Sequence, residues 1–224
     1  MIVLPMFLKF VKDRKQVSYT SPRLFDEYGL PRNPTGRTGI EGRVIGVLLK
    51  YGSNYAADPI VTRMSPETGA LQCLLCRVGG GKGPAPEQYT LPSGMVECSG
   101  VDVTSELAEL FNSNYRKEIE AFFDTGGELV YEGYMNDCRA TDGAWMETRS
   151  AHFHLIPEYT RFIKDLEPGG KKQWVDLPPS VPIYSEHRAY IDTVYAKYVT
   201  AVTATGPEPE GSKKRPHTSL TTTE

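Results

Sequence analysis

The segment from Gln88 to Ser113 restricts the fold of this chain more than any other. An extended run, Gln88 to Leu91, leads into a Pro-Ser-Gly turn, a turn-prone stretch at 97–100 and a helix expected over about 102–111. Proline and glycine interrupt regular structure, so the extended run must change direction before the helix begins. A strand, a tight turn, a loop and a helix in this order predict a helix packed on a sheet, which is typical of an α/β fold.

The flanking sequence supplies the other elements. The apolar run from Leu71 to Val78 predicts a central buried strand. Strands first, with one helix in the middle and one at the end, indicate a mixed sheet sandwiched between helices. The further strands are expected over 43–51, 58–64, 129–135, 144–155 and from Val175, and the further helices over 115–123 and from Ser185.

Composition narrows the class of protein. With 224 residues and 39% hydrophobic content, one globular domain with tails is expected. A net charge of −3 gives no signature of nucleic-acid binding. Four cysteines in a chain of this length do not make a disulfide framework, which indicates a reducing, intracellular compartment. No apolar run reaches the roughly 18 residues of a membrane span.

The two ends differ from the centre. Residues 1–30 form an N-terminal extension, apolar but interrupted by Pro5 and then basic, which fits an import peptide or a segment that docks on a protein partner. Residues 203–224 are rich in Pro, Gly, Thr and charge, which predicts a disordered tail that also offers a surface for partners. The domain itself is expected over 31–202.

The strand, turn, loop and helix resemble the Nudix box, whose family pattern is G-x5-E-x7-R-E-U-x-E-E. With Gly94 as the first glycine, Gly100 stands where the first glutamate belongs, Glu109 keeps one carboxylate, and Asn112 and Ser113 replace the last two glutamates. Three of the four box carboxylates are therefore missing.

Helical geometry explains why this loss matters. Positions 109, 112 and 113 would share one face of a continuous helix, where glutamates could hold Mg²⁺ against a diphosphate. Glu109 is the remaining candidate for a metal ligand. A register shifted by three residues instead uses Glu97, Glu106 and Glu109 as remnant catalytic acids, but it moves the glycine anchor onto Leu91.

Three other segments are similar to the mitochondrial-type ADP-ribose pyrophosphatase branch of the Nudix superfamily, and to the homologous domain of the ADP-ribose-gated melastatin cation channel. They are residues 31–43 with 55–63, residues 134–148, and residues 182–187, so the resemblance covers about 28–200. It implies a Nudix α/β/α sandwich with a mixed sheet. Most of the N-terminal cap domain of that enzyme is expected to have no counterpart here.

The resemblance also implies roles for particular residues. Asp137 and Arg139 would contact the terminal ribose, and Tyr184 and His187 would line the same pocket near the diphosphate. Ser93 and Gly94, in the turn of the box, join them as substrate-binding candidates. The chemistry agrees, because a carboxylate accepts from ribose hydroxyls while a guanidinium presents a planar fork to phosphate oxygens. From residue types alone, Asp137 and Arg139 could equally form a local ion pair in a turn.

Three interpretations follow. The first is a binder of ADP-ribose-like nucleotide diphosphates whose hydrolysis is weak or lost, a pseudoenzyme without a required cofactor. The second is an active, Mg²⁺-dependent ADP-ribose diphosphatase that gives AMP and ribose 5-phosphate. The third is a structural subunit of a larger assembly, with the two tails as docking arms. The resemblance makes a mitochondrial location the natural hypothesis.

Other candidate ligands have simpler explanations. Cys73 and Cys76 lie in the expected buried strand, which predicts core cysteines rather than a zinc site. His152 and His154 lie two apart on a strand without a companion Cys or acid at metal spacing, so they are interpreted as ordinary strand residues.

Overall fold

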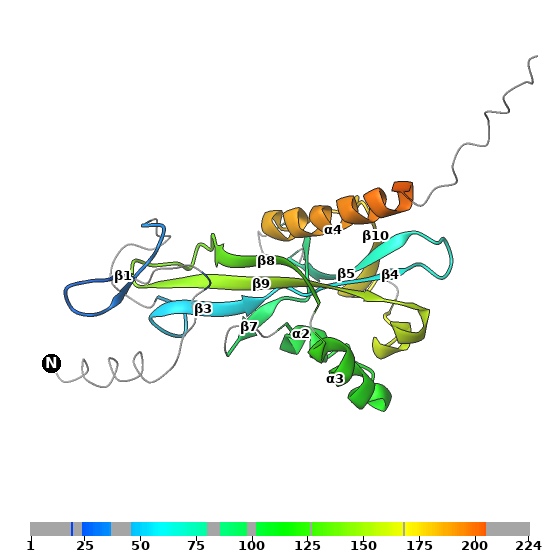
Figure 1. Cartoon of the computed structure of the whole chain (residues 1–224), viewed down its shortest axis with the longest axis horizontal. Helices are drawn as coiled ribbons and strands as arrows, with labels where there is room; N and C mark the ends of the chain where they lie inside the picture. Colours follow the sequence, from blue (N-terminus) through cyan, green and yellow to red (C-terminus); the bar gives the residue numbers. More distant parts are fainter. Residues whose placement is uncertain are drawn as a thin grey trace, which may run out of the picture.

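The computed structural model describes residues 19, 24–36, 46–79, 86–97, 102–125, 127–167 and 169–204. Its centre is an eight-stranded sheet in the order β10-β5-β4-β9-β3-β7, with β6 paired to β5 and β8 paired to β9 (Figure 1). The strands are β3 (Gly52–Ala57), β4 (Ile60–Met64), β5 (Leu71–Val78), β6 (Gln88–Thr90), β7 (Gly94–Val96), β8 (Glu128–Met135), β9 (Ala144–Leu155) and β10 (Lys172–Asp176).

The long strand β9 organises the sheet. Strand β3 runs parallel to its first half, with Gly52 opposite Ala144, and β4 runs parallel to its end, with Ile60 opposite His152. The other pairings in this sheet are antiparallel. Because β3 and β4 follow one another along the same strand, the two residues at their junction, Asp58 and Pro59, lie in the middle of the sheet.

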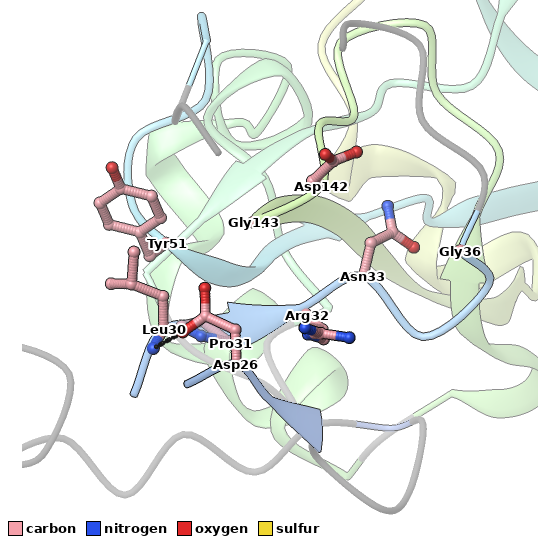
Figure 2. A pocket seen from close by; sticks show the side chains of 9 residues that line it. All are labelled: Asp26, Leu30, Pro31, Arg32, Asn33, Gly36, Tyr51, Asp142 and Gly143. Carbon is pink, nitrogen blue, oxygen red and sulfur yellow. Dashed lines mark hydrogen bonds between the residues drawn. The ribbon is translucent and has the colours of Figure 1, made fainter. Parts of the chain in front are cut away.

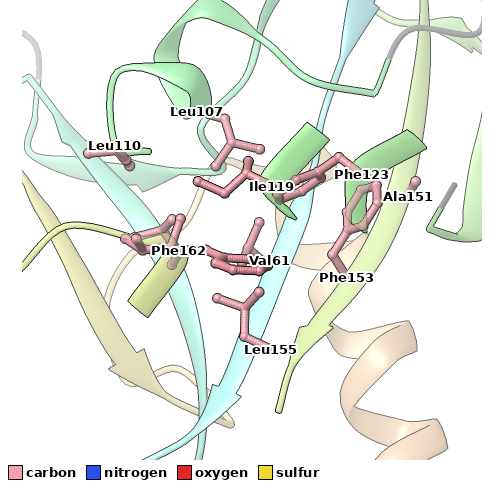
Figure 3. Packing of buried hydrophobic residues seen from close by; sticks show 11 residues of the cluster. Val61, Leu107, Leu110, Ile119, Phe123, Ala151, Phe153, Leu155 and Phe162 are labelled. Carbon is pink, nitrogen blue, oxygen red and sulfur yellow. The ribbon is translucent and has the colours of Figure 1, made fainter. Parts of the chain in front are cut away.

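Helices cover both faces of the sheet (Figure 1). Helices α2 (Ser105–Ala108) and α3 (Arg116–Asp124) pack on one face, and α4 (Ser185–Ala204) packs on the other. Successive side chains of β5 point to opposite faces of the sheet. Leu74 packs in the hydrophobic cluster with α2 and α3, which Figure 3 shows. Cys73 and Leu75 pack in the cluster under α4. The predicted α/β/α sandwich with a mixed sheet is confirmed.

Most predicted elements are confirmed, and one strand was placed wrongly. The strands at 71–78 and 144–155 have the predicted bounds, and the helix that was expected from Ser185 begins there. Of the strand expected over 43–51, residues 43–45 lie outside the described residues, and residues 46–51 form turns and bends. The Asn54 side chain accepts the backbone N–H groups of Leu49 and Lys50, which holds that segment in a turn, and the strand begins at Gly52 instead.

The box helix is shorter than predicted. Helix α2 ends at Ala108, although a helix was expected to continue to residue 111. Beyond it the chain pairs with a distant segment, because Asn112 N donates to Phe162 O at 2.8 Å and Lys164 N donates to Leu110 O at 2.9 Å. The backbone that would have continued the helix is therefore used in tertiary contacts, and Ser113–Tyr115 start a separate 3₁₀ turn, η1.

The predicted end segments are only partly described. Strands β1 (Leu24–Phe25) and β2 (Pro31–Arg32) form a small antiparallel pair, and Tyr19 N donates to Glu147 Oε2 at 2.7 Å. Helix α4 includes residues 203 and 204, whereas the rest of the predicted tail, 205–224, lies outside the described residues, as do residues 1–18. Within the described part of the chain, no helix combines the length and apolar character needed to span a bilayer.

Candidate functional site

A hollow of about 440 Å³ lies where the β3–β4 junction, the β6–β7 turn, the β8–β9 loop and the start of α4 meet. This volume falls within the range typical of small-molecule sites. All six residues that were predicted to bind substrate line it, although they come from distant parts of the sequence. Its lining is Ala56, Asp58, Thr90, Ser93, Gly94, Met95, Met135, Asp137, Cys138, Arg139, Met146, Tyr184 and His187.

Asp137 and Arg139 pair with each other at the mouth of this pocket. Arg139 Nε donates to Asp137 Oδ1 at 2.8 Å, and its Nη2 donates to Oδ2 at 2.6 Å. The hydrogen bonds from Arg139 lower the pKa of the Asp137 carboxyl, which is therefore ionised at neutral pH. The Arg139 side chain is 44% exposed against 10% for Asp137, so the guanidinium meets solvent while the carboxylate is enclosed.

Tyr184 and His187 reach the pocket from the start of α4. Their rings contact edge to face, with centroids 5.0 Å apart. His187 is buried, and its Nδ1 accepts the backbone N–H of Leu91 at 3.2 Å. This bond joins α4 to the strand that leads into the Pro-Ser-Gly turn. Burial raises the pKa of the Tyr184 hydroxyl, which therefore stays neutral and can donate a hydrogen bond.

Ser93 and Gly94 form the part of the pocket nearest to the box. Ser93 Oγ lies 3.4 Å from His187 Nε2. Thr104, the N-cap of α2, donates from Oγ1 to Pro92 O at 2.6 Å and accepts the N–H of Leu107. A Cβ added at Gly94 would meet the Thr104 side chain at 3.4 Å, so the turn packs closely against the helix start. Helix α2 thus supports the pocket through its cap.

Asp58 is a pocket residue that the sequence-based prediction missed. It is 1% exposed, and its Oδ2 accepts the Thr148 hydroxyl at 2.6 Å. Burial opposes ionisation, but the hydrogen bond from His187, together with those from the Thr148 and Ser93 hydroxyls, outweighs it and holds the pKa of the Asp58 carboxyl below its usual value. A signal was present, because Asp58 lies between Tyr55-Ala-Ala57 and Pro59-Ile-Val61, and an aspartate that is buried within such a run must find polar partners.

The remnant box acids lie outside this pocket. Glu97 is exposed. Glu106 and Glu109 both contact the ammonium of Lys172 from β10, with Oε2 atoms 3.1 and 3.0 Å from Nζ. Although partial burial opposes it, the hydrogen bonds to Glu109 and Glu106 raise the pKa of Lys172, so its positive charge is secure at neutral pH.

These residues do not form the donor set that a divalent cation requires. Because α2 ends at Ala108, Asn112 and Ser113 do not share a helical face with Glu109 as predicted; the Asn112 side chain instead caps η1 by accepting the N–H of Asn114. No group of three or more His, Cys, Asp or Glu residues suited to a metal occurs among the described residues. Mg²⁺ prefers several oxygen ligands, and here the two nearby carboxylates share an ammonium.

The other candidate metal ligands, two cysteines and two histidines, lie on strands of the sheet. Cys73 and Cys76 are free and buried in β5, and burial raises the pKa of the Cys76 thiol to about 11, so both remain protonated and inert. His152 Nε2 and His154 Nδ1 lie 2.8 and 2.9 Å from the Thr62 hydroxyl. Their polar atoms are therefore engaged within the sheet.

A second, smaller hollow of about 290 Å³ lies beside the β1–β2 pair (Figure 2). Its lining combines β2 and the turns on either side of it with the residue before β3 and the end of the β8–β9 loop, including Arg32, Tyr51 and Asp142. None of the residues that were predicted to bind substrate lines it. The predicted site and this hollow are therefore separate features of the described chain.

Comparison with known proteins gives the family. No protein-family model matches the chain. It is 34% identical over 188 residues to the protein named "Putative nudix hydrolase 6" of Caenorhabditis elegans, covering 79% of this chain and 68% of that protein. The chain belongs to the Nudix family. Another relative is the mitochondrial ADP-ribose pyrophosphatase of Rattus norvegicus, 35% identical over 198 residues, covering 76% of this chain.

Longer relatives match this chain over part of their length. The chain spans 55% of the rat enzyme, and it spans 13% of the transient receptor potential cation channel subfamily M member-like 2 of Nematostella vectensis, to which it is 32% identical. Among solved structures, a mutT/nudix family protein from Listeria innocua matches with a TM-score of 0.42 and 18% identity, covering 68% of this chain and 98% of that chain.

Proposed function

We propose that this chain binds ADP-ribose-like nucleotide diphosphates and that its hydrolytic activity is weak or lost. One observation carries the proposal: all six candidate binding residues line a single pocket, while Glu97, Glu106 and Glu109 line no part of it. The residues that would hold a sugar diphosphate are assembled. The residues that would hold a metal for its hydrolysis are not.

The pocket residues have suitable chemistry for such a ligand. Arg139 uses Nε and Nη2 for Asp137, which leaves Nη1 for a phosphate or ribose oxygen. Asp137 is ionised and retains acceptor capacity for ribose hydroxyls. Met95, Met135 and Met146 supply apolar, adaptable walls, and the Tyr184 ring offers a flat surface. Residues from four segments would thus enclose one end of the ligand.

The second candidate is an active ADP-ribose diphosphatase, which the identity with the rat enzyme favours. In that reaction, water attacks the diphosphate and gives AMP and ribose 5-phosphate. Bound Mg²⁺ would neutralise the diphosphate and activate the water. The Glu106 and Glu109 carboxylates that could serve it are paired with Lys172, which favours binding over turnover.

Calorimetry with the full chain tests the proposal. ADP-ribose is expected to bind with an affinity that changes less than about threefold when Mg²⁺ is added. The reason is that the described residues include no group of metal ligands that could hold Mg²⁺ beside the bound nucleotide. AMP should bind more weakly, since it lacks the second ribose. Turnover with Mg²⁺ should stay well below about 1 s⁻¹, the lower end of ordinary enzymes.

The outcomes separate the alternatives. Turnover at or above that rate supports the diphosphatase. No heat and no thermal shift at millimolar ADP-ribose favours a structural subunit, whose protein partners would contact residues 1–30 and 203–224. The name of the rat relative places that enzyme in mitochondria, and fractionation of cells that express this chain tests the same location for it.

A further inference from the structure

The ion pair at the mouth of the pocket lies in one short turn of the loop between β8 and β9, residues 136–143. The Ala140 N–H donates to Asp137 O at 3.0 Å and closes this turn around Arg139. Arg139 is half-exposed, whereas Ala140 is buried. The directions in which Asp137 and Arg139 point therefore depend on what holds the buried end of the turn.

Asn33, in the segment that follows β2, holds that end. Its Nδ2 donates to Thr141 O at 3.0 Å, and its backbone N–H donates to Asp142 O at 2.8 Å. Figure 2 shows Asn33 beside Asp142 at the second hollow. Because Thr141 directly follows Ala140, these two hydrogen bonds attach the turn to a residue that lies 108 positions before Thr141 in the sequence.

The Asn33 amide is fully hydrogen-bonded, and its partners determine its orientation. Oδ1 accepts the backbone N–H and the hydroxyl of Thr35 at 3.1 and 3.0 Å, and Nδ2 also reaches the Tyr134 hydroxyl at 3.3 Å. A backbone N–H can only donate and a backbone carbonyl can only accept, so Oδ1 must face Thr35 and Nδ2 must face Thr141. An aspartate could not donate to Thr141 O, and a leucine of similar shape could neither donate nor accept.

We infer that Asn33 is a positioning residue for ligand binding. Through Thr141 it fixes the turn that presents Asp137 and Arg139 to the pocket. Thr141 is fully buried, so without the Asn33 amide its carbonyl would lose a donor that water cannot replace, and the turn would shift. The inference rests on the proposed function and extends the site to a residue that lines the second hollow and not the pocket.

Calorimetry of Asn33→Leu and Thr35→Val, with ADP-ribose and AMP as probes, tests the inference. Leucine removes both sides of the Asn33 amide, whereas Thr35→Val removes only the hydroxyl at Oδ1 and leaves the Nδ2 bond to the loop, so it is the matched control.

Asn33→Leu should weaken ADP-ribose binding about tenfold, as expected when one hydrogen bond to a charged group is misplaced, and should change AMP binding less than about twofold. AMP has no terminal ribose for Asp137 and Arg139 to hold. Thr35→Val should keep the wild-type ratio of the two affinities. A purely structural role of Asn33 would lower both affinities or neither.

Amide hydrogen exchange gives a readout that needs no ligand. In Asn33→Leu the protection of the Ala140 N–H should fall at least about tenfold while the amides of β5 keep theirs, because a loop can open without unfolding the sheet. Equal loss of protection in the loop and in β5 would show a general loss of stability and would contradict the inference.

The other outcomes are equally decisive. An unchanged ratio of affinities in a folded Asn33→Leu variant overturns the inference, as does the same change of ratio in Thr35→Val. If Asn33→Leu does not fold, Asn33→Asp takes its place, because aspartate keeps the bonds from Thr35 and lacks only the donors. If the wild-type chain binds neither probe, the proposed function fails, and the exchange of the Ala140 N–H alone decides whether Asn33 holds the turn.

Discussion

The pocket and the box helix lie next to each other, but they hold their charged groups in opposite ways. In the pocket, Asp58 and His187 are buried and fixed by hydrogen bonds from separate strands and from the backbone. On α2, the side chains of Glu106 and Glu109 are 49% and 68% exposed and share one lysine. A buried charged group lowers the stability of the fold unless it has hydrogen-bond partners, whereas an exposed ion pair contributes little to stability.

This difference separates a group that its neighbours fix in place from a pair of acids that they do not. A buried carboxylate must be supported by a particular set of neighbours, and for Asp58 they come from β9, from α4 and from the β6–β7 turn. An exposed pair of glutamates can be neutralised by any nearby lysine. Under the proposed function, ligand binding and metal-dependent chemistry would depend on different parts of the molecule, so that one could be lost without the other. The following predictions test that separation.

The largest effect is expected from the buried side of α2. Leu107→Ala should lower the free energy of unfolding by about 2–5 kcal/mol, because Leu107 is fully buried against the sheet. Glu106→Gln and Glu109→Gln, on the exposed side, should each change it by less than about 1 kcal/mol. Chemical denaturation of the three variants measures the contrast. Equal losses would mean that the acids of α2 have a structural role.

The second effect concerns the dependence of the free energy of unfolding on pH. It is expected from His152, which lies on β9 and does not line the pocket. Burial and the neighbouring His154 lower the pKa of His152 to about 4 from its usual 6.5. The unfolded chain therefore binds a proton that the folded chain rejects, and the free energy of unfolding should fall as pH decreases from about 6.5 to 4, by up to about 3 kcal/mol.

Thermal unfolding of the wild-type chain and of His152→Gln between pH 8 and pH 5 measures the contribution of His152 to the pH dependence of stability. The variant should lose less stability on acidification, and comparison at pH 8 shows any change in packing alone. Parallel pH profiles for the two chains would contradict the assignment to His152.

The third effect tests the mouth of the pocket. Arg139→Ala should weaken ADP-ribose binding by about 1.5–3 kcal/mol, because it removes a charge-assisted hydrogen bond and leaves Asp137 unpaired. Arg188→Ala, on α4 and paired with Asp192, is the control and should bind as the wild-type chain does. Calorimetry gives both affinities. Similar losses in both variants would point to a general effect of surface charge.

The smallest effect is expected at Lys172. Its replacement by methionine should change the free energy of unfolding by less than about 1 kcal/mol and should leave ADP-ribose binding unchanged, since the ion pairs are exposed and outside the pocket. Without the ammonium, Glu106 and Glu109 become free to attract Mg²⁺, so a thermal shift with Mg²⁺ should appear in Lys172→Met and not in Lys172→Arg. A loss of ADP-ribose binding in Lys172→Met would show that the two regions are coupled.

Much of the fold was predictable from local sequence patterns. The apolar run at 71–78 and the alternation along 144–155 predicted strands with the observed bounds, because the hydrophobic pattern of a strand depends only on the residues of that strand. The strand at 52–57 was missed, since its buried polar side chains, Ser53 and Asn54, concealed the apolar pattern. Their burial depends on hydrogen bonds within the fold that no local pattern predicts.

The sequence by itself determined the sandwich architecture, the family resemblance and the six residues that line one pocket. Only the tertiary structure decided that α2 stops at Ala108, because pairing of residues 110–112 with residues 162–164 replaces the helical hydrogen bonds. It also decided that Lys172 neutralises the remnant acids and that Asp58 lies beneath His187. These are contacts between residues 50 or more positions apart, and spacing along a chain carries no information about such partners.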